Sequence, residues 1–322
     1  MPLKNHPSTL YATAISPDYV VHQVLLPLLA ADHVRVRVHA AGVNRADVLQ
    51  ADGLYPAPAG ASPFLGLEIA GEIISTGAAV DGFYTGQRIA ALCAGGGYAD
   101  IVDVPASWCF ELPATVSFTA GACLPEALLT YAAFAWREGE DMPKTILLQG
   151  GGGGIGHVGV GLFAALGARV VATARAAQAS LVLAQGAADC LDFIKPGYLD
   201  GLAERFSLII DHRGGFMAAQ HLRCLAPYGI LVQLAALEGN ASGIPVSILV
   251  TKGLTWRGGA LRRLSRAAVD NAANWARKVF LPLIVQGKVV PCVYKTMLLD
   301  QSREAHAVLR AGNFYGKVVL VA

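Results

Sequence analysis

The chain has 322 residues, of which 54% are hydrophobic and 15% are charged, and its net charge is +2. The length predicts two domains because one hydrophobic core rarely serves more than about 300 residues, and the composition excludes a disordered chain. The small net charge on scattered Lys and Arg excludes nucleic acid and an anionic membrane surface as partners, which leaves a small molecule.

No targeting or spanning segment is expected. The N-terminal Met1–Ala12 lacks an apolar stretch followed by a cleavage site. The uncharged segment Thr145–Ala168 is long enough to cross a bilayer, but its many glycines predict strand, turn and helix instead. The six cysteines form no CxxC pair and are expected to be reduced. We therefore expect a cytoplasmic protein without contact to a membrane.

The first third of the chain contains short segments typical of antiparallel strands. Val34–His39 alternates apolar and basic residues with a period of two. Glu68–Thr76, Arg88–Leu92 and Ala99–Val104 follow, separated by turn residues. These segments predict a small, strongly bent β-barrel.

Beyond Pro113 the pattern changes to helices that alternate with short apolar strands, which predicts βαβ units and a parallel sheet. The expected strands are Thr145–Leu148, Arg169–Thr173, Leu208–Asp211 and Ile230–Leu234. Apolar residues between Ile155 and Leu166 recur at helical spacing, and Gly167 stands where that helix would end. After about Trp256 the pattern becomes mixed. A final strand, Lys317–Val321, is expected to rejoin the first domain.

The segment between the first of these strands and the following helix contains the motif G-x-G-x-x-G as Gly151, Gly153 and Gly156. Glycines here permit a tight turn and let backbone N–H groups approach a pyrophosphate at the helix N-terminus. The residues expected to bind the cofactor in this turn are Gly151, Gly152, Gly153, Gly154, Ile155 and Gly156. A flexible glycine linker is the alternative, which the flanking strand and helix disfavour.

The end of the second strand indicates which cofactor binds. An acidic residue there would bind the ribose of NAD, but no Asp or Glu occurs from Val170 to Ala188. Thr173 and Arg175 stand at this position, and a guanidinium suits a phosphate. The sequence therefore favours NADPH, with a solvated surface charge as the alternative role for Arg175.

Several spaced motifs carry a resemblance to a known family over nearly the whole chain. They are AAGVNRADVLQADGLYP, GLEIAGEI, GGYADIVDVP, LPEALLTYA, the glycine turn and NFYGKVVL. In this order they resemble the medium-chain dehydrogenase/reductase superfamily, most closely its zinc-free quinone oxidoreductase branch, which includes zeta-crystallin. The resemblance implies an α/β protein with a Rossmann doubly wound parallel sheet and a GroES-like β-barrel catalytic domain. The expected boundaries are 1–118 and 257–322 for the GroES-like domain and 119–256 for the Rossmann domain.

The resemblance also implies that zinc is absent. Zinc-dependent relatives carry their ligands where this chain has Asn44, Arg45 and Leu67, none of which fits a catalytic zinc site. The cysteine-rich lobe of those relatives would fall near Cys93, where no second cysteine is found. No metal is therefore expected. A zinc-dependent alcohol dehydrogenase is the weaker alternative.

By resemblance, Asn44, Tyr55 and Thr130 are the expected catalytic residues around the nicotinamide and the substrate, and Tyr55 is expected to donate a hydrogen bond to a substrate oxygen. Each has a structural alternative: a turn residue for Asn44, an aromatic wall for Tyr55, and a surface or capping hydroxyl for Thr130. Without zinc, hydride transfer from NADPH to a quinone or a related conjugated carbonyl remains feasible.

Three further residues are expected to bind the cofactor: Phe193, Leu234 and Lys317. Phe193 stands where relatives place a tyrosine beside the adenine ribose, and Lys317 has an equally plausible structural role. Relatives place a lysine near Ala177 and Gln178, so Arg175 is left to supply the charge. His212, at the carboxyl edge of the sheet, is not assigned a catalytic role.

Two other functions and one assembly remain open. The same site in a differently shaped pocket would serve an enoyl or enone reductase of a lipid or specialised metabolite. The lack of an unambiguous acid or base leaves room for a non-catalytic NADPH-binding protein. The segment Ile244–Trp256 is expected to supply an edge strand that pairs across a two-fold axis, which predicts a homodimer.

Overall fold

A computed structural model describes residues 10–237, 239 and 242–321 of the chain. They form two compact units, each described here by itself. The first comprises residues up to Pro125, Lys295–Gly312 and the segment from Val318, and the second comprises Glu126–Tyr294 and Asn313–Lys317.

The first unit is built on antiparallel strands. Among the described residues a seven-stranded sheet has the order β14-β15-β3-β4-β5-β7, with β6 paired to β3, and β1 pairs with β2. The strands are β1 (Tyr11–Ile15), β2 (Val21–Leu25), β3 (His33–Gly42), β4 (Glu68–Thr76), β5 (Arg88–Leu92), β6 (Ile101–Pro105), β7 (Cys109–Glu111), β14 (Val293–Leu298) and β15 (Lys317–Val321). The helices are α1 (Arg45–Ala51), α2 (Phe118–Gly121) and α10 (Ser302–Ala311), with short 3-10 turns η1 (Ala106–Trp108) and η5 (Leu299–Gln301).

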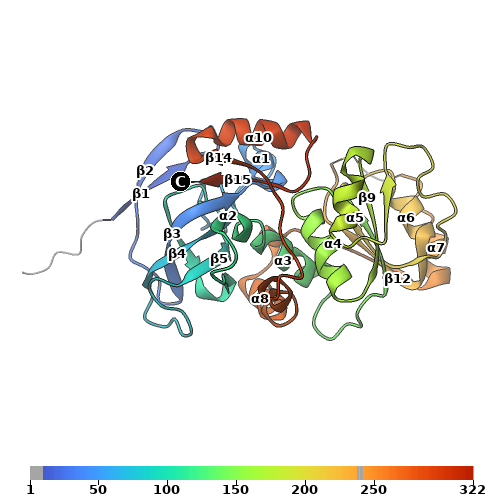
Figure 1. Cartoon of the computed structure of the whole chain (residues 1–322), viewed down its shortest axis with the longest axis horizontal. Helices are drawn as coiled ribbons and strands as arrows, with labels where there is room; N and C mark the ends of the chain where they lie inside the picture. The colour runs from blue at the N-terminus through green and yellow to red at the C-terminus, as the bar shows by residue number, and fades with distance from the viewer. Residues whose placement is uncertain (1–9, 238, 240–241, 322) are drawn as a thin grey trace, which may run out of the picture. The chain divides into compact units, whose positions relative to one another are not determined.

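Strand β3 organises this unit because it pairs with β4, β6 and β15. Val34, Val36 and Val38 alternate along it and are buried, as the period of two predicts. Two register shifts in the β3–β4 ladder bend the sheet. The C-terminal strand β15 runs antiparallel to β3, where Figure 1 shows it in dark red beside blue, so the expected return of the C-terminus to the first domain is confirmed.

The second unit contains a parallel sheet. Among the described residues it has six strands in the order β10-β9-β8-β11-β12-β13, all paired in parallel. This is the order 3-2-1-4-5-6 of a Rossmann fold. The strands are β8 (Thr145–Gln149), β9 (Arg169–Ala174), β10 (Asp189–Asp192), β11 (Phe206–Asp211), β12 (Leu225–Gln233) and β13 (Thr255–Gly258).

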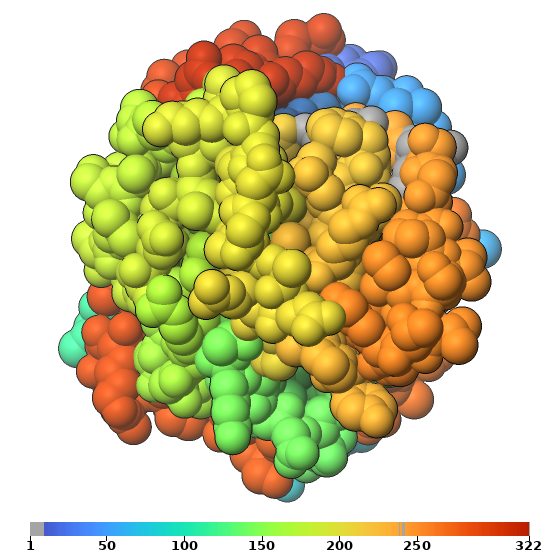
Figure 2. Space-filling model, turned by 90° about the vertical axis from the view of Figure 1, so that its right-hand side faces the viewer, coloured from blue at the N-terminus to red at the C-terminus, as the bar shows by residue number. Residues whose placement is uncertain are grey.

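Helices cover both faces of this sheet. The helical segments are α3 (Pro125–Thr130), the π-helical η2 (Tyr131–Ala135), α4 (Gly156–Ala165), η3 (Ala176–Gln178), α5 (Ala179–Ala184), α6 (Ala218–Cys224), α7 (Val246–Lys252), η4 (Leu261–Arg263), α8 (Arg266–Val279) and α9 (Leu281–Val285). Figure 1 shows α4 and α5 on one side of the sheet and α6 and α7 on the other. Figure 2 looks onto the outer surface of this unit, where segments coloured yellow-green to orange lie side by side. Buried Leu147, Ile209, Leu222 and Leu231 form part of the core beneath α6 and α7.

The glycine-rich segment that was long enough to span a membrane folds as strand β8, a turn and helix α4, as expected. Gly167 ends this helical region with φ +93°, a conformation that side chains disfavour. One other helical stretch in the described ranges, Phe118–Ala135, is apolar and long enough to cross a membrane, but 72% of it is buried. Such burial is typical of a core helix.

The second unit is larger than the Rossmann domain expected from the sequence, since residues 257–294 cluster with it. Helix α8 packs against η2, where the Trp275 indole N–H donates to the Trp136 carbonyl at 2.9 Å. The two indole rings meet edge to face with centroids 5.0 Å apart. Aromatic burial thus joins α8 to the parallel-sheet unit.

The segment Ile244–Trp256 is not one edge strand, which corrects the expectation. Residues Val246–Lys252 form α7, which ends at Gly253 in the left-handed conformation with φ +63°. Only its last two residues, Thr255 and Trp256, belong to the edge strand β13. Proline before Val246 and glycine after Lys252 favour a short helix over an extended strand.

Candidate cofactor and active site

The turn between β8 and α4 has a shape that only glycine permits at two positions. Gly150 has φ +80°, and a Cβ on Gly156 would lie 2.1 Å from the carbonyl oxygen of Gly150. The turn therefore brings the chain back against itself directly before α4. Because the first N–H groups of a helix lack partners within the helix, the turn offers donors to an anion.

Thr173, near the end of β9, stabilises this turn through hydrogen bonds to Gly150 and Gly151. Its hydroxyl accepts the N–H of Gly150 at 3.0 Å, and its carbonyl accepts the N–H of Gly151 at 2.8 Å. The hydroxyl in turn donates to Oε1 of Gln149 at 2.7 Å. Thr173 is fully buried, so the structure shows it positioning the turn through contacts inside the protein.

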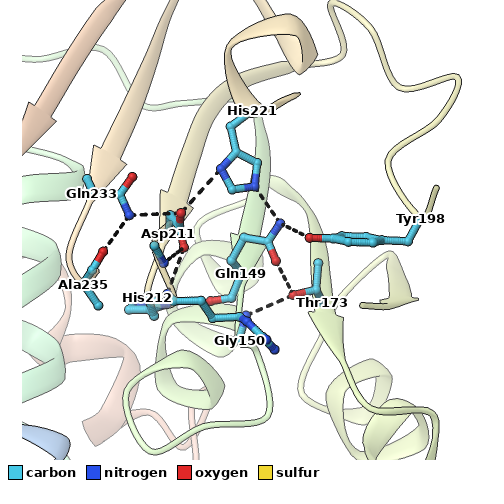
Figure 3. Close-up of polar contacts among 11 residues, drawn as sticks. Gln149, Gly150, Thr173, Tyr198, Asp211, His212, His221, Gln233 and Ala235 are labelled. Carbon is cyan, nitrogen blue, oxygen red and sulfur yellow. Dashed lines mark hydrogen bonds and ion pairs between the residues drawn. The ribbon is translucent and has the colours of Figure 1, made fainter. Parts of the chain in front are cut away.

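Gln149 links the turn to a buried network that Figure 3 shows. Its Nε2 donates to the Tyr198 hydroxyl at 3.1 Å and lies 2.8 Å from Nε2 of His221. An amide nitrogen only donates, so His221 accepts at Nε2 and carries its ring proton on Nδ1. Burial lowers the pKa of His221, which keeps the ring neutral in this arrangement.

The other end of the network is Asp211, the last residue of β11. Its Oδ1 accepts the backbone N–H groups of Arg213 and Gly214, each at 2.8 Å. Its Oδ2 accepts from Nε2 of Gln233 at 3.0 Å and faces His221 Nδ1 at 3.5 Å. The carboxylate is thus satisfied inside the sheet edge and fixes the loop after β11 (Figure 3).

A second contact at this edge joins η2 to the glycine turn. The Tyr131 hydroxyl lies 3.1 Å from the Ile155 carbonyl oxygen and 3.2 Å from Nε2 of His212. Nδ1 of His212 lies 2.8 Å from the Gln149 carbonyl oxygen, so Nδ1 carries the proton. Burial raises the pKa of Tyr131 well above its ordinary value and lowers that of His212. Both groups are therefore neutral, and the single phenolic proton serves either acceptor.

The segment Asn313–Lys317, distant in sequence, lies against the glycine turn. The Gly316 N–H donates to the Gly152 carbonyl at 3.0 Å. Lys317 is 1% exposed, and its Cε lies 3.1 Å from the position that a Cβ on Gly154 would occupy. The structure thus places the stem of this expected cofactor ligand directly beside the turn.

Gln178 lies near the position where the resemblance places a lysine in relatives. Its side chain contacts Arg175 and Phe314 and lies close to Gly152 of the glycine turn. Its Oε1 accepts the Arg175 N–H at 3.0 Å, and its Nε2 donates to the Phe314 carbonyl at 2.5 Å. A Cβ on Gly152 would lie 2.8 Å from the same Oε1. Gln178 therefore supports the turn instead of supplying charge.

The remaining expected cofactor residues follow the ends of neighbouring strands. Exposed Arg175 follows β9, Phe193 follows β10, and Leu234 follows β12 with its N–H bonded to the Asp211 carbonyl at 2.9 Å. A cavity of about 90 Å³ opens at this edge between Phe193, Tyr198 and His221. Parallel sheets bind their ligands at this edge.

In the first unit, Asn44 is the N-cap residue of α1 and is 5% exposed. Its Nδ2 donates to Oε1 of Glu68 at 2.8 Å, and its backbone N–H donates to Oδ2 of Asp47 at 2.8 Å. Oδ1 of Asp47 accepts the Gly66 N–H at 3.2 Å. Asn44 is thus fixed at the start of α1, and its side chain is held by a buried carboxylate.

Tyr55 belongs to the first unit, as Asn44 does, whereas Thr130 belongs to the second. Tyr55 lies in the loop beyond α1 and is half-buried, with its N–H bonded to the Leu49 carbonyl at 3.1 Å. Thr130 is the last residue of α3 in the second unit and is buried. Burial contradicts the surface alternative for the Thr130 hydroxyl.

The positions that hold zinc ligands in zinc-dependent relatives are engaged differently here. Nη2 of Arg45 donates to the Leu309 carbonyl at 3.0 Å, and Leu67 is buried with its carbonyl bonded to the Cys93 N–H at 2.6 Å. Within the described ranges no group of three or more His, Cys, Asp or Glu side chains is placed to hold a metal ion.

Sequence reasoning missed the polar network beneath the turn. Gln149, Asp211 and His221 are spread over 73 positions, so no local pattern connects them. Gln178 was visible as a glutamine three residues after Arg175, the position from which a Glu or Gln side chain accepts the N–H of the N-cap residue. The Arg213 side chain, whose guanidinium carbon lies 3.7 Å from the centre of the Phe193 ring, had no signal in the sequence.

Two family models match the chain. Residues 30–114 match the alcohol dehydrogenase GroES-like domain, and residues 166–320 match a model described as zinc-binding dehydrogenase. Together they span both units.

Proteins similar over nearly the whole chain include quinone oxidoreductases. A quinone oxidoreductase-like protein 2 homolog of Nematostella vectensis is 28% identical over 91% of this chain and 82% of its own length. A quinone oxidoreductase of Pseudomonas aeruginosa is 28% identical over 89% of this chain and 90% of its own. Polyketide synthase GfsB of Streptomyces halstedii is 30% identical over 95% of this chain, which spans only 5% of that protein.

Solved structures show the same fold. An Escherichia coli quinone oxidoreductase complexed with NADPH matches with a TM-score of 0.79 at 24% identity. The match covers 97% of this chain and 100% of that chain. The CurK enoyl reductase has a TM-score of 0.80 at 20% identity, with coverage of 97% of this chain and 98% of its own. The α/β fold with a Rossmann sheet and a GroES-like domain is confirmed.

Proposed function

We propose that this chain, a member of the medium-chain dehydrogenase/reductase superfamily that is similar to quinone oxidoreductases, is an NADPH-dependent oxidoreductase. It reduces a quinone or a related conjugated carbonyl without zinc. The observation that carries the proposal is the glycine turn held by Thr173, with Arg175 two residues further along the chain. Quinone oxidoreductases that match most of both chains support the choice of reaction.

The residues of the second unit fit a dinucleotide phosphate. A side chain on Gly156 would collide with the Gly150 carbonyl, so the turn keeps its amides open to a close approach. Lys317 lies beside Gly154 and supplies positive charge there. When bound, NADPH supplies a hydride; these protein groups bind the pyrophosphate and orient the cofactor.

We assign Tyr55 the role of donating a hydrogen bond to the substrate oxygen, with Asn44 and Thr130 as the other residues around the nicotinamide and substrate. The support is the resemblance of the surrounding motifs to the family. Tyr55 is half-buried, which suits a contact to a transient substrate. A Tyr55→Phe variant is expected to lower kcat with NADPH affinity unchanged, whereas equal activity would remove Tyr55 from this role.

We propose that the protein works without zinc because of the side chains at the positions that hold zinc ligands in zinc-dependent relatives. Asn44 is bonded to Glu68 and Arg45 to the Leu309 carbonyl, and neither an amide held this way nor a guanidinium replaces a thiolate or imidazole ligand. Treatment of the purified protein with a zinc chelator is expected to leave turnover unchanged. Stoichiometric zinc in metal analysis, with activity lost on chelation, would overturn this part.

The test of the reaction is an acceptor panel with NADPH in steady state. We expect oxidation of NADPH with 1,4-benzoquinone or 9,10-phenanthrenequinone. We expect no reduction of NADP+ when ethanol is supplied as the hydride donor. A Gly156→Ala variant serves as the control for cofactor-dependent turnover. NADPH that binds without being oxidised by any acceptor would instead indicate a non-catalytic NADPH-binding protein.

Enone reduction is the second candidate, because polyketide synthases match almost the whole chain and CurK enoyl reductase shares the fold. The same glycine turn would serve it, so only the acceptor distinguishes the two reactions. Turnover of 2-alkenals or enoyl thioesters without turnover of quinones would favour this candidate and reject the first.

We further propose a cytoplasmic homodimer. All six cysteines lie in the described ranges and none of them forms a disulfide, which suits a reducing compartment. β13 is the edge strand of the parallel sheet, and an exposed edge can pair with a second copy. Light scattering after gel filtration is expected to give twice the chain mass of 33.6 kDa; the monomer mass would exclude the dimer.

A further inference from the structure

Helix α10, near the C-terminal end of the chain, lies beside helix α1, whose N-cap residue is Asn44 (Figure 1). Nη2 of Arg45, the first residue of α1, donates to the Leu309 carbonyl of α10 at 3.0 Å. Nη2 of Arg310 donates to Oδ1 of Asp52, the C-cap residue of α1, at 2.5 Å. Both ends of α1 are thus bonded to one helix that is distant in the sequence.

A third connection between the two helices runs through the interior of the same unit. His306 of α10 is 0% exposed. Its Nε2 lies 3.2 Å from the Tyr98 hydroxyl, and its Nδ1 lies 2.9 Å from the Tyr19 hydroxyl. The fully buried Tyr98 hydroxyl donates to the carboxylate of Asp47. Oδ2 of Asp47 accepts the backbone N–H of Asn44 at 2.8 Å. We call His306, Tyr98 and Asp47 the His–Tyr–Asp network.

The protonation states give this network one direction. Burial raises the pKa of Tyr98 well above its ordinary value, so the hydroxyl keeps the proton that it donates to Asp47. Because that proton is already used, the Tyr98 oxygen accepts from His306, whose ring proton therefore lies on Nε2. Burial lowers the pKa of His306 to about 4, so above that pH the ring is neutral and Nδ1 accepts from the Tyr19 hydroxyl. Each group donates inward, towards the carboxylate at the start of α1.

Asp47 is the point at which the network acts on Asn44. Asp47 is 0% exposed, and its two oxygens accept the N–H groups of Asn44 at 2.8 Å and of Gly66 at 3.2 Å. A buried carboxylate is held in place by its hydrogen bonds, so removal of the Tyr98 donor weakens that hold. Since the backbone of Asn44 is bonded to Asp47 and its Nδ2 to Glu68 at 2.8 Å, a shift of Asp47 displaces the amide.

We propose that His306 is a positioning residue of the reductase: through Tyr98 and Asp47 it fixes Asn44 where its amide contacts the nicotinamide or the substrate. The inference rests on the proposed function, which gives Asn44 that contact. Catalysis depends on such placement, because a displacement of about 1 Å can slow a reaction by about 100-fold. Helix α10 thereby acts on turnover through residues that are not among the candidate catalytic ones.

The test compares two tyrosines that contact opposite nitrogens of one imidazole ring. Tyr98→Phe removes the hydroxyl on the inner side and is expected to lower kcat with 1,4-benzoquinone by about 10-fold, with the Kd of NADPH changed by less than about 2-fold. Tyr19→Phe is the matched control: it removes the hydroxyl on the outer side, leaves the His–Tyr–Asp network complete and is expected to keep the kcat of the unmodified protein. Urea unfolding should show some loss of stability in both variants, since each loses a hydrogen bond of His306.

A double-mutant cycle with Asn44→Ala shows whether Tyr98 acts through Asn44. Asn44→Ala alone is expected to lower kcat by about 10-fold or more. In that background Tyr98→Phe is expected to cause no further loss, because the amide that it positions is gone. His306→Gln keeps a side-chain donor and is expected to retain more of kcat than His306→Phe. Circular dichroism verifies that each variant is folded, and the His306 pair replaces Tyr98→Phe in the cycle if that variant unfolds.

The outcomes separate the inference from the proposed function. Unchanged kcat in Tyr98→Phe, or equal losses in Tyr98→Phe and Tyr19→Phe, would mean that the network only stabilises the fold, which overturns the inference. Multiplied losses in the double variant would show that Tyr98 acts by another route and would also overturn it. If Asn44→Ala keeps full turnover, the inference fails while the proposed reaction stands. If the unmodified protein oxidises NADPH with no acceptor, the proposed function is wrong and the inference falls with it.

Discussion

The hydroxyl of Thr173 donates to the side-chain oxygen of Gln149 at 2.7 Å, and this contact ties the polar network under the sheet edge to the glycine turn. The same hydroxyl accepts the Gly150 N–H. One oxygen thus satisfies two buried neighbours at the point where the turn leaves β8. The geometry of the proposed phosphate site therefore depends on a side chain that makes its bonds inside the protein.

Replacing Thr173 by valine is expected to destabilise the protein by about 2 kcal/mol, because the Gly150 N–H and the Gln149 oxygen both lose their partner while the volume stays nearly the same. We also expect weaker NADPH binding as the turn loosens. Urea unfolding and a fluorescence titration with NADPH measure the two effects. Thr173→Ser keeps the hydroxyl and should retain most of the affinity; a valine variant with unaltered stability would contradict the role of this bond.

A Gly156→Ala substitution should disrupt the turn, since the new Cβ would lie 2.1 Å from the Gly150 carbonyl oxygen. Overpacking of this kind costs about 2 to 3 kcal/mol. Gly153→Ala is the control in the same turn, because its nearest neighbour would lie 3.3 Å away. Thermal unfolding should show a clearly larger loss for the Gly156 variant. Equal losses would mean that the turn adapts to a side chain at either place.

Tyr131→Phe removes the only proton that the Ile155 carbonyl and His212 Nε2 share. We expect a loss of about 1 to 2 kcal/mol in unfolding free energy, typical of one buried hydrogen bond. Tyr228→Phe is a suitable control, since Tyr228 is 83% exposed. If both variants unfold at the same urea concentration, the Tyr131 hydroxyl does not stabilise the turn.

Stability should fall in mild acid. Burial lowers the pKa of His157 and of His306 to about 4, from an ordinary value of 6.5. The unfolded chain therefore binds more protons between pH 6.5 and 4, so stability is complete above pH 6.5 and is lost as the pH falls through this window. Each histidine contributes about 1 to 3 kcal/mol to this loss.

Urea unfolding at several pH values measures this slope. In His157→Gln one titrating group is gone, so the dependence between pH 4 and 6.5 should be shallower than in the unmodified protein. A slope that does not change in this variant would show that His157 titrates normally in the folded state.

The sequence alone determined most of the fold. The periods of Val34–His39 and of Ile155–Leu166 gave a bent antiparallel unit and a glycine turn before a helix, because alternation and helical spacing are local properties of the chain. It also gave the acid-free end of β9 with Arg175. The strand predicted over this part of Ile244–Trp256 was wrong, because the apolar residues of Val246–Lys252 fit a helix as readily as a strand.

Only the tertiary structure decided how the site is supported. The parallel sheet brings the ends of β8, β9 and β11 together, so Gln149, Thr173 and Asp211 meet although they are far apart in the chain. The fold also places Arg213 on the ring of Phe193. Such contacts depend on strand order and loop path, which are set by the packing of the whole unit and leave no periodic signal in the sequence.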